Sequence, residues 1–232
     1  ETSAERSSAR ETVLRVAAGS LCKMFLRYFD INAGSEVLEI GGIPYKKFNP
    51  DTQKETCWKN GSIGGVIKVD ISGVPAGLGS NEQWFTRLDS MIAGAVISIP
   101  SVKGVYIGDT DIHRKKGLES LDSFISPEGD RNSNKSGGIE GGISNGRPLI
   151  VTAFFKPVPT QPFEVDSFSL KDGLPGKTRI GQNDMWCIER AAVIVENIVC
   201  MTVAESFLKK FGSDYLIDIE HAYKAFRERC RK

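Results

Sequence analysis

The sequence predicts an α+β fold in which antiparallel sheets pack on central helices. Residues 66–72 alternate between apolar and polar side chains, which is the pattern of a strand with one solvated face. Residues 186–211 form a long helical stretch that is nearly apolar through its middle. The predicted strands and helices do not alternate as the β-α-β units of a parallel sheet, so an antiparallel arrangement is favoured.

The first part of the chain predicts one long helix and two strands. Residues 36–43 read as a strand stopped by two glycines, residues 44–62 are polar and are expected to be irregular, and residues 66–72 form the next strand. A helix over residues 9–29 is predicted by apolar side chains at helical spacing, namely Leu14, Ala17, Ala18, Leu21, Phe25 and Tyr28.

The middle of the chain predicts a turn, a helix and a short strand. The glycine-rich residues 73–79 form the turn, Pro100 ends the helix, and residues 102–107 form the strand. Asn81 is expected to cap this helix. Its inner row is expected to be Trp84, Leu88, Met91 or Ile92, and Ala95.

Two long polar connectors, residues 108–148 and 160–181, flank a buried strand over residues 149–155. Connectors of this length in a compact domain are usually functional or disordered. Helices over residues 186–211 and 217–229 complete the prediction.

Charge and composition exclude several classes of function. The formal net charge is +1, from 30 basic and 29 acidic residues, so no overall basic field attracts nucleic acid. Only His113 and His221 are available as histidine ligands, which makes a histidine metal site improbable. The most apolar run, residues 191–204, is too short and too polar for a membrane span, so no membrane partner is expected.

Five scattered cysteines without a Cys-x-x-Cys pair indicate reduced thiols. The cytoplasm is therefore the expected location, and a plastid-type compartment stays open because a transit peptide is removed on import. The cysteines are Cys22, Cys57, Cys187, Cys200 and Cys230.

Three segments are candidates for chemistry. The first is the glycine-rich run of residues 137–146, whose backbone N–H groups are free of side-chain obstruction and could converge on an anion. The run matches neither the Walker nor the Rossmann pattern, and a flexible loop is the simpler interpretation. A general anion-binding module is a further hypothesis that rests on this run alone.

The second segment lies at the start of the first helix. Arg6, Ser7, Ser8 and Arg10 are placed where unpaired N–H groups and the helix dipole favour a phosphate or carboxylate. The alternative is that Ser8 and Glu11 only form a capping box.

The third segment, residues 181–184, leads into the longest apolar helix. Asp184 under an apolar roof could have a perturbed pKa and take part in proton transfer. The alternative is that Asp184 only caps the helix.

Several segments resemble chorismate synthases, in the order in which that family has them. The similarity covers essentially the whole chain, and colinear matches of this number are highly specific. The matching segments are residues 8–12 with 15–19 (SARET and RVAAG), 62–65, 73–79, 98–105, 107–109, 137–139 with 141–146, Lys156 with Pro157, and Arg190 with Ala191 and Glu196 at family spacing after Asp184.

The resemblance implies a function that composition does not reveal. Chorismate synthases convert 5-enolpyruvylshikimate-3-phosphate to chorismate by a 1,4-anti elimination of phosphate. They require reduced FMN without net redox change, and they are typically homotetramers in which antiparallel sheets sandwich central helices. The resemblance also implies a single domain here, of which the N-terminal part is absent.

The family's functional positions carry over to particular residues of this sequence. Asp184 matches the catalytic aspartate, and Arg10 would face the substrate. The flavin contacts would fall on Arg6, Ser7, Ser8, Pro100, Ser101, Gly141, Lys156, Pro157, Val158, Pro159, Thr160 and Gln182.

The sequence departs from the family pattern near these positions. Gln182 and Asn183 stand where the family usually has Arg and His, and residues 156–160 carry fewer hydroxyls. A helix before Ser62 is expected to be shortened to residues 57–61. The family's two N-terminal histidine motifs and its Arg-rich stretch are absent. The alternative to an active enzyme is a non-catalytic fragment or degenerate paralogue that keeps the fold for assembly or flavin binding.

Overall fold

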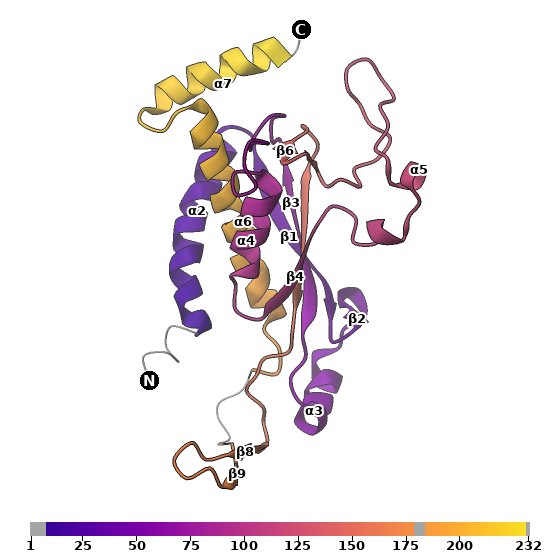
Figure 1. Cartoon of the computed structure of the whole chain (residues 1–232), viewed down its shortest axis with the longest axis vertical. Helices are drawn as coiled ribbons and strands as arrows, with labels where there is room; N and C mark the ends of the chain where they lie inside the picture. Colours follow the sequence, from indigo (N-terminus) through magenta and orange to yellow (C-terminus); the bar gives the residue numbers. More distant parts are fainter. Residues whose placement is uncertain (1–7, 179–183, 231–232) are drawn as a thin grey trace.

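A five-stranded antiparallel sheet is the frame of the molecule (Figure 1). The computed structural model describes residues 8–178 and 184–230. The strands lie in the order β2-β1-β3-β7-β4, and every neighbouring pair is antiparallel. Their bounds are β1 (Asn32–Ile40), β2 (Ile43–Pro44), β3 (Gly65–Ser72), β4 (Val102–Ile107) and β7 (Leu149–Phe155).

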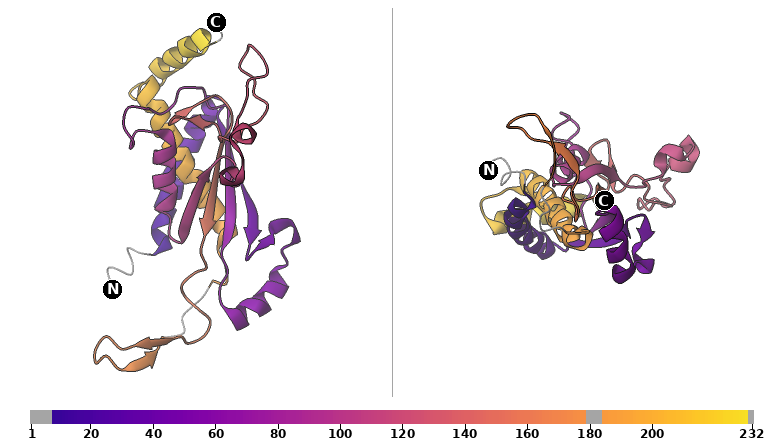
Figure 2. Two further views of the ribbon diagram at one scale, coloured as in Figure 1. Left: turned by 45° about the vertical axis from the view of Figure 1, so that its right-hand side comes forward. Right: turned by 90° about the horizontal axis from the view of Figure 1, so that it is seen from below.

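Three helices cover one face of this sheet (Figures 1 and 2). The central helix α6 (Ile188–Phe211) packs against β1 and β3, and α4 (Leu88–Ile97) packs against β4. The helix α2 (Thr12–Tyr28), which follows the short 3₁₀ turn η1 (Ala9–Glu11), packs on α6. The core therefore lies between the sheet and α6.

The contact between α2 and α6 depends on a glycine. A Cβ atom on Gly19 would lie 2.5 Å from the carbonyl oxygen of Asn197, which no side chain permits. Ser20, the next residue along α2, also contacts Asn197, because its hydroxyl donates a 3.1 Å hydrogen bond to Oδ1 of Asn197. Close approach of the two backbones thus positions α2 along the central helix.

The C-terminal helix α7 (Leu216–Cys230) is held by aromatic packing. The Tyr223 ring lies 5.1 Å from Phe207, 5.2 Å from Phe211 and 5.4 Å from Phe29. Edge-to-face contacts of this kind add to the free energy gained by burying the rings.

The opposite face of the sheet is solvated at β1 and β3, where the Lys68 ammonium lies 3.1 Å from Asp70 and 3.5 Å from Glu36.

The outer face of α2 is apolar yet exposed, with Leu14 77% and Leu21 69% accessible. A second large sheet over the helices, which the resemblance implies, does not occur among residues 8–178 and 184–230.

The two polar connectors contain short elements. The first forms η3 (Ile112–Arg114), α5 (Gly117–Ser120) and the hairpin β5 (Ile139–Glu140) and β6 (Ile143–Ser144). The second forms a projecting hairpin of β8 (Asp166–Phe168) and β9 (Pro175–Lys177), seen at the bottom of Figure 1 and called the arm below.

Most predicted elements are confirmed, and three details are wrong. Residues 44–62, which were expected to be irregular, contain η2 (Tyr45–Lys47) and α3 (Pro50–Asn60). The helix before Ser62 is therefore not shortened to residues 57–61. The helix expected after Asn81 begins only at Leu88, and Trp84 is 75% exposed. The strand predicted from residue 36 begins at Asn32, because β3 offers a pairing partner along that whole length.

The helix predicted over residues 186–211 is observed as α6, which is longer than the run 191–204 that was judged too short for a membrane span. With 24 residues, α6 is long and apolar enough to cross a membrane, but most of it is buried against the sheet, α2 and α4. A buried helix at the centre of a domain is apolar all round for this reason.

Candidate functional site

The turn of residues 61–64, between α3 and β3, joins several of the predicted site segments at one end of the sheet. The Ser62 hydroxyl donates a 2.6 Å hydrogen bond to the carbonyl of Val158. The N–H of Ile63 donates to the carbonyl of Met185, 2.9 Å away. Gly64 has no space for a side chain, since a Cβ atom would lie 2.1 Å from the Phe155 carbonyl oxygen.

The strands β7 and β4 bring Lys156 next to Ser101. The N–H of Lys156 donates a 2.9 Å hydrogen bond to the Ser101 carbonyl, just beyond the last paired residues of the two strands. Ser101 adopts a left-handed backbone with φ of 73°, which is uncommon for a residue other than glycine. Backbone strain of this kind clusters at functional sites.

Asp184 lies beside this turn but is not roofed by apolar side chains. Its carboxylate is 57% exposed and forms a 2.7 Å ion pair with Arg190 in the first turn of α6. The expectation of a buried carboxylate is therefore wrong for this chain by itself. The hydrogen bond between Met185 and Ile63 places Asp184 next to the turn 61–64, which also binds Val158 through Ser62.

These segments form the sheet-end cluster, which contains residues 61–64, Ser101, the run 156–160 and Asp184 with Met185. Pro100 belongs to the same end, because it precedes Ser101 directly. Lys156, Thr160 and Asp184 are exposed in this cluster. It offers a cation and a hydroxyl, which can bind a phosphate group, and a carboxylate, which can hold a proton.

The start of α2 lies at the same end of the molecule (Figure 1). Ser8 caps η1, with its hydroxyl accepting from the Arg10 N–H at 3.3 Å. The expected capping box is incomplete, because Glu11 pairs with Arg15 at 2.9 Å instead. Arg15 also donates to Ser98 at 2.7 Å, which ties α2 to the residues just before Ser101.

Gly141 is not brought to this cluster within the chain. It lies in the turn between β5 and β6, next to Gly142, whose carbonyl accepts from the Leu88 N–H at the start of α4. Ser101 follows the other end of α4, and the ten residues of that helix span roughly 15 Å. The structure therefore separates Gly141 from the other predicted flavin contacts.

The glycine-rich run is an ordered hairpin in which the N–H groups of its first two glycines are in use. Gly138 donates to Asn134 Oδ1 at 2.9 Å, and Gly137 donates to the Asn134 carbonyl at 3.2 Å. The N–H of Asn145 donates to the Gly138 carbonyl at 2.9 Å. These donors are not free for an anion, contrary to the expectation of a convergent N–H nest.

A single buried carboxylate holds the connector that precedes this hairpin. Asp122 accepts hydrogen bonds from the Ser133 hydroxyl and from the N–H groups of Lys135 and Ser136, at 2.5 to 2.8 Å. Burial alone would raise the pKa of Asp122, but these hydrogen bonds outweigh burial and hold the pKa well below its usual value. Asp122 is therefore a structural anion.

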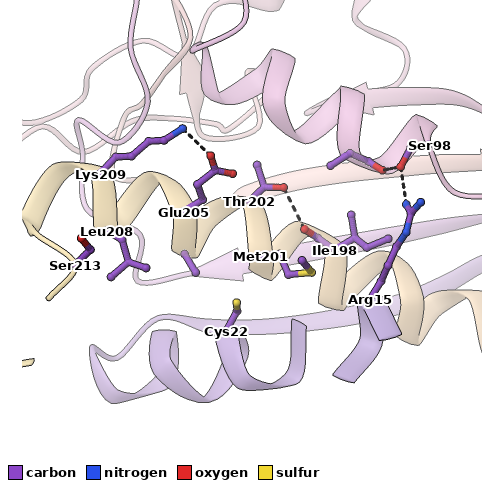
Figure 3. A pocket seen from close by; sticks show the side chains of 12 residues that line it. Arg15, Cys22, Ser98, Ile198, Met201, Thr202, Glu205, Leu208, Lys209 and Ser213 are labelled. Atoms are coloured by element: carbon purple, nitrogen blue, oxygen red, sulfur yellow. Dashed lines mark hydrogen bonds and ion pairs between the residues drawn. The ribbon is translucent and has the colours of Figure 1, made fainter. Parts of the chain in front are cut away.

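A groove of about 710 Å³ lies between α2 and α4 over α6 (Figure 3). Its floor is apolar, with Cys22, Ile198 and Met201 among its residues, and Arg15 and Ser98 mark the end nearest the sheet-end cluster. The residues that line it include none of the predicted flavin or substrate contacts. An apolar floor of this kind suits packing more than phosphate binding.

Three predicted contacts, Arg6, Ser7 and Gln182, lie outside the described residues. Two residues that the sequence did not single out for a role, Ser62 and Gln161, make the contacts that hold the cluster together. Only the match of residues 62–65 to a family motif signalled the first, and no pattern signalled the second.

The architecture is that of an α+β protein whose helices cover one face of an antiparallel sheet, with several of the predicted site segments at one sheet end. A family model described as chorismate synthase matches residues 1–208. This chain belongs to the chorismate synthase family.

Individual relatives agree with that assignment. The chorismate synthase of Thermoanaerobacter pseudethanolicus is 39% identical over 226 residues, covering 96% of this chain and 65% of that protein. The chorismate synthase of Geobacter sulfurreducens is 34% identical over 264 residues, covering 98% and 67%. A crystal structure of chorismate synthase matches with a TM-score of 0.80 and 30% identity, covering 97% of this chain and 70% of that one. The chain thus spans about 65% of the length of its first curated relatives.

Proposed function

We propose that this chain carries the FMN-binding region of a chorismate synthase, which eliminates phosphate from 5-enolpyruvylshikimate-3-phosphate to give chorismate. The observation that carries the proposal is the sheet-end cluster. Segments far apart in sequence, at residues 61–64, 101, 156–160 and 184–185, meet there through direct hydrogen bonds. Three of these four segments, at residues 101, 156–160 and 184–185, coincide with positions at which the resemblance implies flavin contacts or the catalytic aspartate.

The residues of the cluster fit FMN chemically. Lys156 supplies an ammonium group for the phosphate, and Thr160 supplies a hydroxyl on the same run. The missing Cβ of Gly64 and the left-handed backbone of Ser101 allow the chain to pass closely at the strand ends. When bound, reduced FMN lends electron density that assists the loss of phosphate from the substrate.

The remaining chemistry belongs to the protein. Asp184 is positioned by Arg190, whose guanidinium fixes the carboxylate at 2.7 Å. In the proposed role, Asp184 holds a proton near the flavin ring, and Arg10 binds an anionic group of the substrate. Water exclusion at the assembled site would strengthen each of these charge contacts.

The separation of Gly141 from the cluster supports a site completed by another copy of the chain, and the resemblance implies a homotetramer. The seven residues of β7 lie between the two regions, and they span roughly 20 Å. A second copy of the chain could bring its own Gly141 turn to the cluster, and a Cβ atom on Gly141 would have open space around it in the single chain. The proposed partners are therefore further copies of this chain and the small-molecule substrate, in the cytoplasm.

The test is a chorismate-formation assay with reduced FMN on the full-length gene product. The proposal predicts turnover that depends on reduced FMN. Absence of turnover by a folded protein that binds FMN would contradict the enzymatic role.

The second candidate is a non-catalytic relative that keeps the fold for assembly or flavin binding. The exposure of Asp184 and the replacement of the family's Arg by Gln182 favour it. An FMN titration separates flavin binding from assembly alone, because a dissociation constant in the micromolar range or tighter, about −8 kcal/mol, requires a formed pocket.

A further inference from the structure

The side chain of Gln161 joins the run 156–160 to the turn 61–64 through both atoms of its amide. Its Oε1 accepts from the Ser62 N–H at 3.0 Å. Its Nε2 donates to the Val158 carbonyl at 3.0 Å and lies 3.2 Å from the Ser62 hydroxyl. The Ser62 hydroxyl donates to the same Val158 carbonyl at 2.6 Å. These contacts are called the Gln161 clamp below.

The clamp is built into the fold at both partners. Ser62 is 9% exposed, so its N–H and hydroxyl have little access to water and depend on Gln161 and Val158. Gly61 has φ of 94°, and a Cβ atom there would lie 2.4 Å from Oε1 of Gln161. The backbone at residue 61 thus leaves the space that the amide fills.

The clamp controls which groups of the run face a ligand. Pro157 and Pro159 have no N–H, and the N–H of Lys156 is engaged by the Ser101 carbonyl. A carbonyl oxygen carries partial negative charge and would repel a phosphate, but the clamp turns the Val158 carbonyl toward Ser62. The Lys156 ammonium and the Thr160 hydroxyl, both on exposed residues, are left as anion partners.

We propose that Gln161 and Ser62 are positioning residues for the phosphate group of FMN. They hold the Val158 carbonyl away from the phosphate and so present Lys156 and Thr160 to it. The inference rests on the proposed function, because it requires that this run binds FMN.

The test compares FMN with riboflavin, which has the same ring system without the phosphate, on the full-length gene product. Gln161→Leu removes the amide while keeping a side chain of similar size. We expect the dissociation constant for FMN to rise about tenfold, from the loss of two or three hydrogen bonds that fix the run. We expect the constant for riboflavin to change by less than about twofold, since no phosphate is present to feel the change.

A matched control is Gln53→Leu, the same substitution on α3, where the side chain makes no hydrogen bond to any residue that the structure describes. Neither dissociation constant should change for this variant. Ser62→Ala, which keeps the bond from the Ser62 N–H to Gln161, should weaken FMN binding by a smaller factor than Gln161→Leu. Amide hydrogen exchange at Ser62 should accelerate in Gln161→Leu without flavin present, which reports the clamp independently of ligand binding.

The outcomes distinguish the two proposals. If the wild-type protein binds FMN and Gln161→Leu binds it equally well, the positioning role is overturned while the proposed function stands. Equal losses for FMN and riboflavin would also overturn it, because they would indicate a general distortion of the pocket. A wild-type protein that binds neither flavin would overturn the proposed function and the positioning role together.

Discussion

The two long polar connectors are ordered in different ways. The first, residues 108–148, is organised from within by Asp122, whose carboxylate collects hydrogen bonds from three residues further along the same connector. The second, residues 160–181, is organised from outside, because Ser62, Ile63 and Ser101 hold the residues that flank it against the sheet. The arm projects between those flanking residues (Figure 2).

This difference separates structural from ligand-responsive parts of the molecule. A connector that satisfies its own backbone groups around a buried anion is ordered whether or not a ligand is present. A connector whose flanking residues are hydrogen-bonded at the sheet end, with exposed Lys156 and Asp184 beside those contacts, has charged groups left to engage a ligand. Substitutions in the first should therefore change stability, and substitutions in the second should change binding.

The largest effect is expected for Asp122→Ala. Loss of the buried carboxylate leaves the half-buried N–H groups of Lys135 and Ser136 without partners, which costs about 3 kcal/mol of unfolding free energy. Urea unfolding measures this change. Asp130→Ala, in the exposed part of the same connector, is the control and should change stability by less than about 0.5 kcal/mol. A loss of similar size in both variants would contradict the assigned role of Asp122.

The contribution of Asp122 should also depend on pH. Because the pKa of this carboxyl is lowered on folding, its stabilisation is complete above its unfolded pKa of about 3.9 and is lost as the pH falls toward the folded value. The stability difference between wild type and Asp122→Asn should therefore shrink below about pH 4. Urea midpoints measured from neutral to acidic pH check this, and a constant difference would disprove the linkage.

A smaller effect, on binding alone, is expected for Lys156→Met. Removal of the ammonium should weaken FMN binding about tenfold, or about 1.4 kcal/mol, while the unfolding free energy stays unchanged because the side chain is exposed. Flavin fluorescence titration measures the affinity. Lys171→Met, on the arm, serves as the control because it removes the same charge away from the sheet-end cluster. An equal loss of FMN affinity in this variant would show that the effect comes from the net charge of the protein and not from Lys156 in particular.

The smallest effect on stability is expected for Asp184→Ala. The ion pair with Arg190 is more than half exposed on both sides, so its loss should cost less than about 0.5 kcal/mol. Turnover should nevertheless be lost, with FMN affinity kept, if Asp184 handles a proton. An active Asp184→Ala enzyme would remove this residue from the mechanism.

The strands and the two main helices were predictable because their burial follows a regular period. Alternation over β3 and the apolar length of α6 were visible in the sequence, and both are confirmed. Helix α3 was missed because Cys57 is its only buried residue, so no apolar row marks it. Its signal was local, since Asn49 caps the helix and Pro50 occupies its first turn.

The site was harder to predict than the fold. Residues such as Ser101 and Lys156 could be named from a family pattern, but the pairing of their backbones depends on the register between β4 and β7. Gln161 contacts the N–H and the hydroxyl of Ser62, 99 positions away in sequence, and no local pattern encodes such contacts. The exposure of Asp184 could not be predicted either, because it depends on what surrounds the start of α6.

Amide hydrogen exchange of the full-length gene product with and without FMN tests the central claim most directly. We predict that FMN slows exchange in peptides covering residues 61–64, 101–102 and 156–160, while the segment around Asp122 exchanges equally in both states. FMN binding that leaves these sheet-end peptides unchanged and protects other segments would contradict the account.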